Sequence, residues 1–387
     1  MKKLYWKRTV KIVSLLLLVV LCFLFLQEYV FRDYWQYGQG STRIKGFYRE
    51  PDHTLDVVLI GDSTVYAGYS PAYAYDVEGI TSYNMAIGAN VCTTWRPITE
   101  EILREQDPQL IVVDIGGIQY DNLQKKFDNS TTIHALIDNM PMNANRLRTI
   151  RREVVGRYGG DAFEYLFPFL RYHNDWSSFG ELPPRVWELF SWKYISRNVL
   201  KGTVARVLSE PVRPKTMDVR NDNSTEELTP ESEAILREYL DYCRENDLNV
   251  VFMSVPCRIR EDDNSLTVFR RENRAGEIVR EYGYDFWNFH HYTDEIGLDP
   301  AQDFYNDAHL NYRGQIKFTE YLARFLREEY GVTPGALTDA QRAEWARSAD
   351  YIHRFYAFLA QQPGTEEEPY SERTEVMRAL DVMGTES

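Results

Sequence analysis

The hydrophobic residues of this chain fall into short runs that alternate with amphipathic stretches. Five runs are apolar and rich in β-branched or aromatic residues, which is typical of strands buried in a sheet. These runs are residues 55–60, 82–85, 110–115, 249–255 and 284–289. Helical signals cover residues 95–104, 230–245, 271–282, 314–329 and 338–362. Strands that alternate with helices predict right-handed βαβ units, and therefore an α/β fold with a parallel sheet.

One apolar stretch near the N-terminus is longer than these runs. Residues 12–26 carry no charged side chain, and as a helix they span about 22 Å of a hydrocarbon core that is ~30 Å thick. Flanking apolar residues extend the stretch, and five cations with no acidic residue precede it. This layout predicts a transmembrane signal-anchor, with the bulk of the protein outside the cytoplasm. A cleaved signal peptide and a peripheral helix are the alternatives.

The same pattern divides the chain into four parts. Residues 1–31 form a cytoplasmic tip and the anchor, and residues 32–54 form a stalk. An α/β domain spans residues 55–330, interrupted at about 121–228 by a stretch that we expect to be a helical insertion over the edge of the sheet. Residues 331–387 form a C-terminal helix and an acidic tail.

Composition excludes several classes of protein. A chain of 387 residues with 44% hydrophobic residues is long enough to bury a core without disulfides or metals. Its formal net charge of −14 makes it a poor nucleic-acid binder, because phosphate contacts need clustered cations. Four cysteines do not make a disulfide-framed module, and Cys243–Cys257 is the only nearby pair that could form a bridge.

The polar residues that follow the strands indicate nucleophilic catalysis. Ser63 follows the first strand, His309 follows the last one, and the carboxyl ends of parallel strands share one edge of the sheet. A serine hydroxyl is a weak nucleophile until a base takes its proton. We expect His309 to be that base and Asp307 to orient it, with Asn306 or Asp303 as alternatives. The structural alternatives are that Ser63, His309 and Asp307 only cap or begin helices.

These motifs resemble those of the SGNH (GDSL-like) hydrolase superfamily over roughly residues 55–120 and 245–328. The block Gly61-Asp62-Ser63-Thr64 is similar to the family's nucleophile block, and Asp307-Ala308-His309 is similar to its terminal Asp/His block. The resemblance implies a three-layer flavodoxin-like sheet and an oxyanion hole made by the N–H groups of Ser63 and Gly88. The family usually shows Gly-x-Asn-Asp after the third strand. Here that place holds Gly116-Gly117-Ile118-Gln119-Tyr120-Asp121-Asn122, so Gln119 and Asn122 are the candidates for the third donor.

The spacing Asp-x-His and the N-terminal anchor resemble a membrane-associated branch that moves acyl groups on exported polysaccharides. Alginate O-acetyltransferase-like proteins and the D-alanyl transfer proteins of teichoic-acid modification belong to it. This resemblance implies a cell-surface glycan or acyl ester as substrate, the membrane and a membrane-bound acyl-donor protein as partners, and no cofactor.

Together these observations predict a membrane-anchored, extracytoplasmic serine esterase or O-acyltransferase that acts on acyl groups, acetyl foremost, of surface glycans. His173 and Arg258 are further candidates for substrate binding. The histidines and aspartates of residues 290–309 lack the spacing of a metal site, so no metal is predicted. The alternative function is a non-catalytic glycan-binding or assembly module with the same fold.

Overall fold

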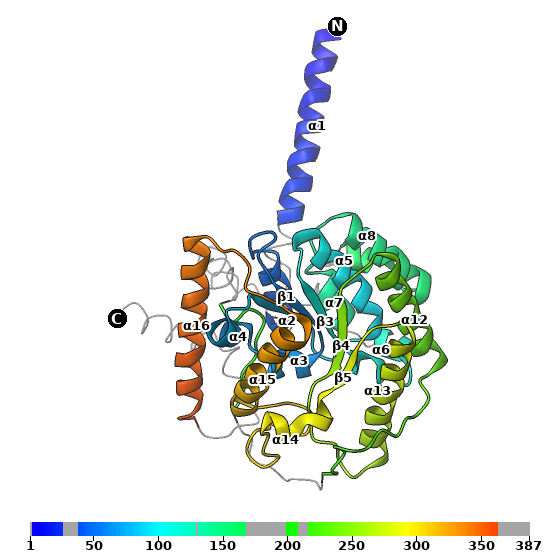
Figure 1. Ribbon diagram of the computed structural model, residues 1–387. Coiled ribbons are helices and arrows are strands. Elements are labelled where there is room, and N and C mark those ends of the chain that lie inside the picture. Colours follow the sequence, from blue (N-terminus) through cyan, green and yellow to red (C-terminus); the bar gives the residue numbers. More distant parts are fainter. Residues whose placement is uncertain (1, 26–37, 129–130, 168–198, 208–215, 363–387) are drawn as a thin grey trace.

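A single parallel sheet forms the centre of the protein (Figure 1). The computed structural model describes residues 2–25, 38–128, 131–167, 199–207 and 216–362. The strand order is β2-β1-β3-β4-β5, and all neighbours are parallel. The strands are β1 (Val57–Gly61), β2 (Ser82–Ala86), β3 (Leu110–Asp114), β4 (Val250–Ser254) and β5 (Phe286–Asn288). The predicted α/β class is confirmed, and the order is compatible with a flavodoxin-like fold, whose switch point lies between β1 and β3.

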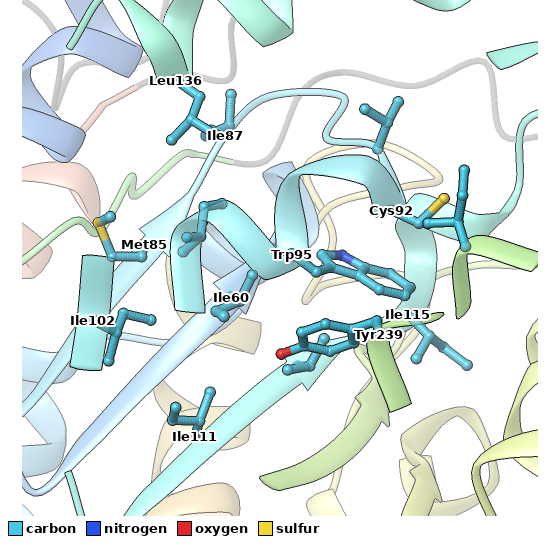
Figure 2. Close-up of a cluster of buried hydrophobic side chains, with 14 of the residues drawn as sticks. Ile60, Met85, Ile87, Cys92, Trp95, Ile102, Ile111, Ile115, Leu136 and Tyr239 are labelled. Atoms are coloured by element: carbon cyan, nitrogen blue, oxygen red, sulfur yellow. The ribbon is translucent and has the colours of Figure 1, made fainter. Parts of the chain in front are cut away.

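Helices cover both faces of the sheet, because successive side chains of each strand point to opposite faces. On one face, Val58 and Ile60 of β1 pack in a core formed largely by the helices that cover this face. These are α2 (Gly38–Phe47), α5 (Trp95–Glu105), α12 (Pro230–Glu245) and α13 (Asp263–Glu281). In Figure 2, Trp95 and Tyr239 lie together within this core, near Ile60. The predicted helices at 95–104 and 230–245 are therefore confirmed.

The opposite face carries the helices that position the candidate site. They are α3 (Ser63–Gly68), α4 (Pro71–Glu78), α14 (Thr293–Ile296) and α15 (Tyr312–Tyr330), with α16 (Asp339–Leu359) packed against α4. Buried hydrogen bonds tie α15 to the segment that follows β1. Ser70 N–H donates to Thr319 Oγ1 at 2.9 Å, and Gln315 Nε2 donates to Ala67 O at 2.9 Å.

Capping side chains set the ends of the later helices. Asn311 Oδ1 accepts from the N–H groups of Arg313 and Gly314, so α15 begins slightly before the predicted residue 314. Asp262 Oδ1 accepts from Ser265 N–H at 2.8 Å, so α13 begins well before the predicted residue 271. The predicted helix at 338–362 is confirmed as α16, which starts with a capping box made by Thr338 and Gln341.

The predicted stalk is wrong for residues 38–54. Ile44 and Phe47 of α2 are fully buried in the main core, and Tyr83 Oη donates to Arg43 O at 2.8 Å. This segment is therefore part of the domain. Residues 32–37 lie outside the described residues.

The described part of the predicted insertion is helical. It contains α6 (Leu123–Asp128), α7 (Thr131–Ile137), α8 (Ala144–Thr149), the π-helical η4 (Ile150–Arg157) and α9 (Ala162–Leu166). Because α7 contacts α2 and α8 contacts α5, these two helices extend the layer on one face of the sheet rather than lying only over its edge. Residues 168–198 and 208–215 lie outside the described residues.

The N-terminal helix α1 spans Lys2–Phe25, and its large apolar side chains from Val10 to Leu21 are exposed. Among the residues that the structure describes, no helix has both the length and the apolar content needed to cross a bilayer. The predicted transmembrane helix is therefore not supported. All four cysteines are free, so Cys243 and Cys257 form no bridge.

Candidate active site

Ser63 lies at the first position of α3, directly after β1, at the carboxyl edge of the sheet. Asp62 caps this helix, because its Oδ1 accepts from Thr64 N–H at 2.7 Å and from Thr64 Oγ1 at 2.8 Å. Gly61 allows the turn to be tight. A Cβ at Gly61 would lie 2.3 Å from Val65 Cγ2 and 2.9 Å from Asp114 Cβ. The sequence therefore fixes the serine at a crowded strand-to-helix turn.

His309, which comes much later in the chain, lies next to Ser63. It lies in the loop that connects α14, which follows η8 (Phe289–Tyr292), to the start of α15. In this loop Phe304 and Leu310 form an antiparallel bridge. His309 Nε2 lies 2.8 Å from Ser63 Oγ, which is hydrogen-bond distance. The structure thus brings together the two residues that the sequence predicts as nucleophile and base.

The second nitrogen of His309 is held by Asn306, and this contact fixes the tautomer. Asn306 Oδ1 accepts from the backbone N–H groups of Ala308 and His309, both at 3.0 Å. Only an oxygen can accept from two backbone donors, so the amide orientation is determined by its surroundings. His309 Nδ1, 2.9 Å from the same oxygen, must therefore donate its proton to it. Nε2 is left as the acceptor for the Ser63 hydroxyl, which is the tautomer that a general base needs.

Asp307 does not orient His309, so the predicted role of Asp307 is wrong. Its Oδ1 accepts from Arg258 at 2.6 Å, and its Oδ2 lies 3.9 Å from Arg260. Arg258, a predicted substrate-binding residue, is largely buried in this ion pair, and its backbone N–H also donates to Asp307 O at 2.7 Å. The ion pair shapes the loop before His309. Asp303, the other alternative, is buried beside Lys317 at 2.5 Å.

The candidate oxyanion donors are only partly in place. Ser63 is the first residue of α3, so its N–H has no acceptor within the helix. Gly88 is partly exposed in the loop after β2, which is tied to β1 by a bond from Ile87 N–H to Gly61 O at 3.1 Å. Gln119 and Asn122 are engaged locally. Gln119 Nε2 donates to Gly116 O at 2.8 Å, and Asn122, which is exposed, caps α6 by accepting from Lys125 N–H.

The buried carboxyl groups of Asp62 and Asp114 lie at the turn that carries Ser63, and no sequence motif assigned them a role. Asp114, at the end of β3, accepts from Gly116 N–H at 3.2 Å and from Val255 N–H at 3.3 Å. A Cβ at Gly116 would lie 3.0 Å from Asp114 Oδ2 and 3.5 Å from Asp62 Oδ2, so both oxygens face the same small space. Burial raises the pKa of both carboxyls, and the charge of Asp62 raises the pKa of Asp114 further.

His309 is a base with an unusually low proton affinity. Burial lowers its pKa to about 3, and the positive charge of Arg206 lowers it in the same direction. The imidazole is therefore neutral and able to accept a proton throughout the physiological pH range. Arg206 was also missed by the sequence analysis, because it stands in the predicted insertion without any motif around it.

The remaining candidates either have other partners or fall outside the described residues. His173 falls outside the described residues. His290 Nδ1 accepts from Cys257 N–H at 3.3 Å, and His291 Nε2 donates to Asp222 O at 3.1 Å. In the described part of the chain, no group of three or more His, Cys, Asp or Glu side chains is arranged to hold a metal ion.

No protein-family model matches this chain, and no curated protein matches it.

Proposed function

We propose that this protein is a serine esterase or O-acyltransferase of the SGNH type. The observation that carries the proposal is the 2.8 Å contact between Ser63 Oγ and His309 Nε2, with the histidine held by Asn306 in the tautomer that accepts a proton. The placement of Ser63 next to the switch point of a parallel sheet supports a ligand site there. The motifs that resemble the SGNH superfamily surround the same two residues.

The reaction follows from this geometry. Ser63 Oγ attacks the acyl carbon of an ester while His309 Nε2 takes the hydroxyl proton. The tetrahedral oxyanion forms near the N–H groups of Ser63 and Gly88. When it collapses, the carbon–oxygen bond to the alcohol breaks, and His309 returns the proton to that alcohol. Water or a second hydroxyl then attacks the acyl-enzyme by the reverse steps. Water gives an esterase, and a glycan hydroxyl gives a transferase.

The site also explains why an amide is sufficient at position 306. The orienting group must accept the Nδ1 proton and keep the ring in place. Asn306 does both, although it offers no negative charge to the imidazolium that forms during the reaction. We therefore expect a slower enzyme than one with a carboxylate at this place, and one whose base stays unprotonated in mildly acidic surroundings.

A fluorophosphonate probe tests the proposal. Wild-type protein should form one covalent adduct at Ser63, located by mass spectrometry, and the variants Ser63→Ala and His309→Ala should not be labelled. Ser224→Ala, which changes an exposed serine far along the chain, is the matched control and should be labelled like the wild type. A folded wild type that remains unlabelled would overturn the proposal.

A non-catalytic glycan-binding module is the second candidate. It is favoured by one observation, namely that Gln119 and Asn122, the two candidates for the third oxyanion donor, are engaged in local hydrogen bonds. Each such donor contributes about 100–1000-fold in rate. An unlabelled, folded protein that still binds glycan would support this function instead.

We also propose that the domain works at the cell envelope, on a surface glycan, with a membrane-bound acyl donor as partner. The cation-rich start of α1 and the exposed apolar side chains that follow it support attachment near the N-terminus. A cysteine introduced at exposed Ser224 should react with an impermeant maleimide on intact cells. Protection until lysis would contradict this location.

A further inference from the structure

Arg206 is fixed close to the candidate catalytic pair by backbone hydrogen bonds. Its carbonyl oxygen accepts from Tyr312 N–H at 2.7 Å, at the start of α15 and three residues after His309. Two residues earlier, Val204 N–H donates to Tyr66 O at 2.8 Å, in the helix that Ser63 begins. The short segment at 199–207 therefore runs between the elements that carry the nucleophile and the base.

The guanidinium of Arg206 has a stacking partner but no anion. It lies 4.8 Å from the centroid of the Tyr305 ring, and Tyr305 N–H donates to His309 O at 2.8 Å. Its Nε is buried without a hydrogen-bond partner. Among the described residues, no carboxylate forms an ion pair with it, whereas Arg258, in the loop after β4, is paired with Asp307. A desolvated donor without an acceptor costs about 1–3 kcal/mol, and more when it is charged.

This cation also opposes the chemistry of the site. During attack, His309 becomes an imidazolium, and both burial, the larger effect, and the charge of Arg206 lower the pKa of His309 and so disfavour that state. An anion bound to Arg206 would remove the contribution of its charge at the moment when the proton moves. The benefit would therefore appear in the chemical step as well as in binding.

A second cation interacts with Asp62, the residue before Ser63. Lys126 of α6 lies 4.4 Å from the centroid of the Tyr120 ring, and burial lowers its pKa while the Asp62 carboxyl opposes this shift. No ion pair involves Lys126 within the described residues. Two cations without ion-pair partners, one acting on His309 and the other on Asp62, are unexpected in a protein with a net charge of −14.

We propose that the ester attacked by Ser63 is carried by an anionic glycan, and that Arg206 binds a carboxylate or phosphate group of that glycan beside the ester. This inference rests on the proposed function, because it assigns the substrate class of the same site. Arg206 contributes a fork of N–H donors that matches either anion. Lys126 is the second contact, for charge further along the glycan.

A matched set of substrates tests the inference. The rates of deacetylation of a mono-O-acetylated methyl glucoside, the corresponding methyl glucuronoside and the corresponding methyl glucoside 6-phosphate are compared. These differ only at C6, so the ratio of kcat/KM values isolates the effect of charge. We expect the wild type to prefer an anionic ester by about 10- to 100-fold. Preference for the uronate or for the phosphate identifies which anion the glycan carries.

The variants separate recognition from other roles of Arg206. In Arg206→Gln the preference should fall to about 1, because the neutral side chain no longer pairs with the anionic group of the substrate. Arg206→Lys keeps the charge and should retain part of the preference. Arg313→Gln, which removes an exposed cation of α15, is the control and should leave the ratio unchanged. A wild type without preference, or an unchanged ratio in Arg206→Gln, would overturn the inference.

A binding measurement distinguishes failure of this inference from failure of the proposed function. If Ser63 proves unreactive toward the phosphonate probe, the proposed chemistry fails, but anion recognition is still measurable. Methyl glucuronoside or glucose 6-phosphate should bind to Ser63→Ala by calorimetry, and binding should weaken by about 10-fold or more in Ser63→Ala/Arg206→Gln. Equal binding by both proteins, or none, would overturn the role of Arg206.

Discussion

Replacing Asn306 by aspartate tests how the base is oriented. Asn306 Oδ1 accepts from three donors, the N–H groups of Ala308 and His309 and the Nδ1–H of His309. A carboxylate accepts from all three as well, so Asn306→Asp preserves the loop. The only new feature is a negative charge about 3 Å from the imidazole.

The magnitude follows from that distance. An opposite charge this close raises a histidine pKa by about 1–3 units. The pKa of His309 should therefore move from about 3 to about 4–6. Each unit corresponds to about 1.4 kcal/mol of imidazolium stabilisation, so kcat/KM for a neutral ester at pH 8 should rise by up to about 10- to 1000-fold. Asn306→Ala loses the acceptor and should be slower than the wild type by about 100-fold or more.

Two measurements on purified protein check this prediction. The pH dependence of 4-nitrophenyl acetate hydrolysis between pH 3 and 8 should show its acid limb at higher pH in Asn306→Asp. NMR titration of labelled histidine gives the pKa of His309 without relying on activity. The reasoning is refuted if the pH profile and the titration of Asn306→Asp superimpose on those of the wild type, or if Asn306→Ala keeps full activity.

Three further predictions concern the turn that carries Ser63. Gly61→Ala places a Cβ 2.3 Å from Val65 Cγ2, so the free energy of unfolding in urea should fall by about 1–3 kcal/mol and activity should fall with it. An unchanged urea midpoint would contradict the crowding at this turn. The pKa values of Asp62 and Asp114 are raised in the folded state, so the folded protein holds their protons to a higher pH than the unfolded chain does. Stability should therefore fall as the pH rises above the unfolded pKa near 4 and through the folded pKa values. Asp62→Asn keeps the cap and removes one charge, so stability should fall less between about pH 4 and 8, whereas parallel curves would argue against a coupled pair. The activity of the wild type should persist at pH 5, although a histidine with an ordinary pKa of 6.5 is only about 3% neutral there. A loss of activity of tenfold or more between pH 7 and pH 5, in a protein that remains folded, would contradict the low pKa of His309.

The sheet and the candidate catalytic pair were predictable because strong local signals carry them. The runs that became β1, β3 and β4 are apolar and short, and the carboxyl ends of parallel strands meet at one edge. Ser63 and His309 follow strands at this edge, so their positions in the sequence were enough to predict that they meet.

The residues that hold the pair were not predictable, because their roles depend on which way neighbouring side chains point. Asn306 and Asp307 are adjacent in sequence, and the choice between them was decided by Arg258, which binds the carboxylate. Arg206 has no motif, and only the backbone path of its segment places it near His309. The helix α2 was missed because its polar residues outweigh Ile44 and Phe47 in the pattern.

The long separation of Ser63 and His309 has a consequence for biosynthesis. The nucleophile turn belongs to the part of the chain that is made first, and its partner comes 246 residues later. Docking of α15, through Gln315 and Thr319, is needed to bring the imidazole to the hydroxyl. Under the proposed function, a nascent or truncated polypeptide would therefore be inactive until its C-terminal elements have folded against β1 and α3.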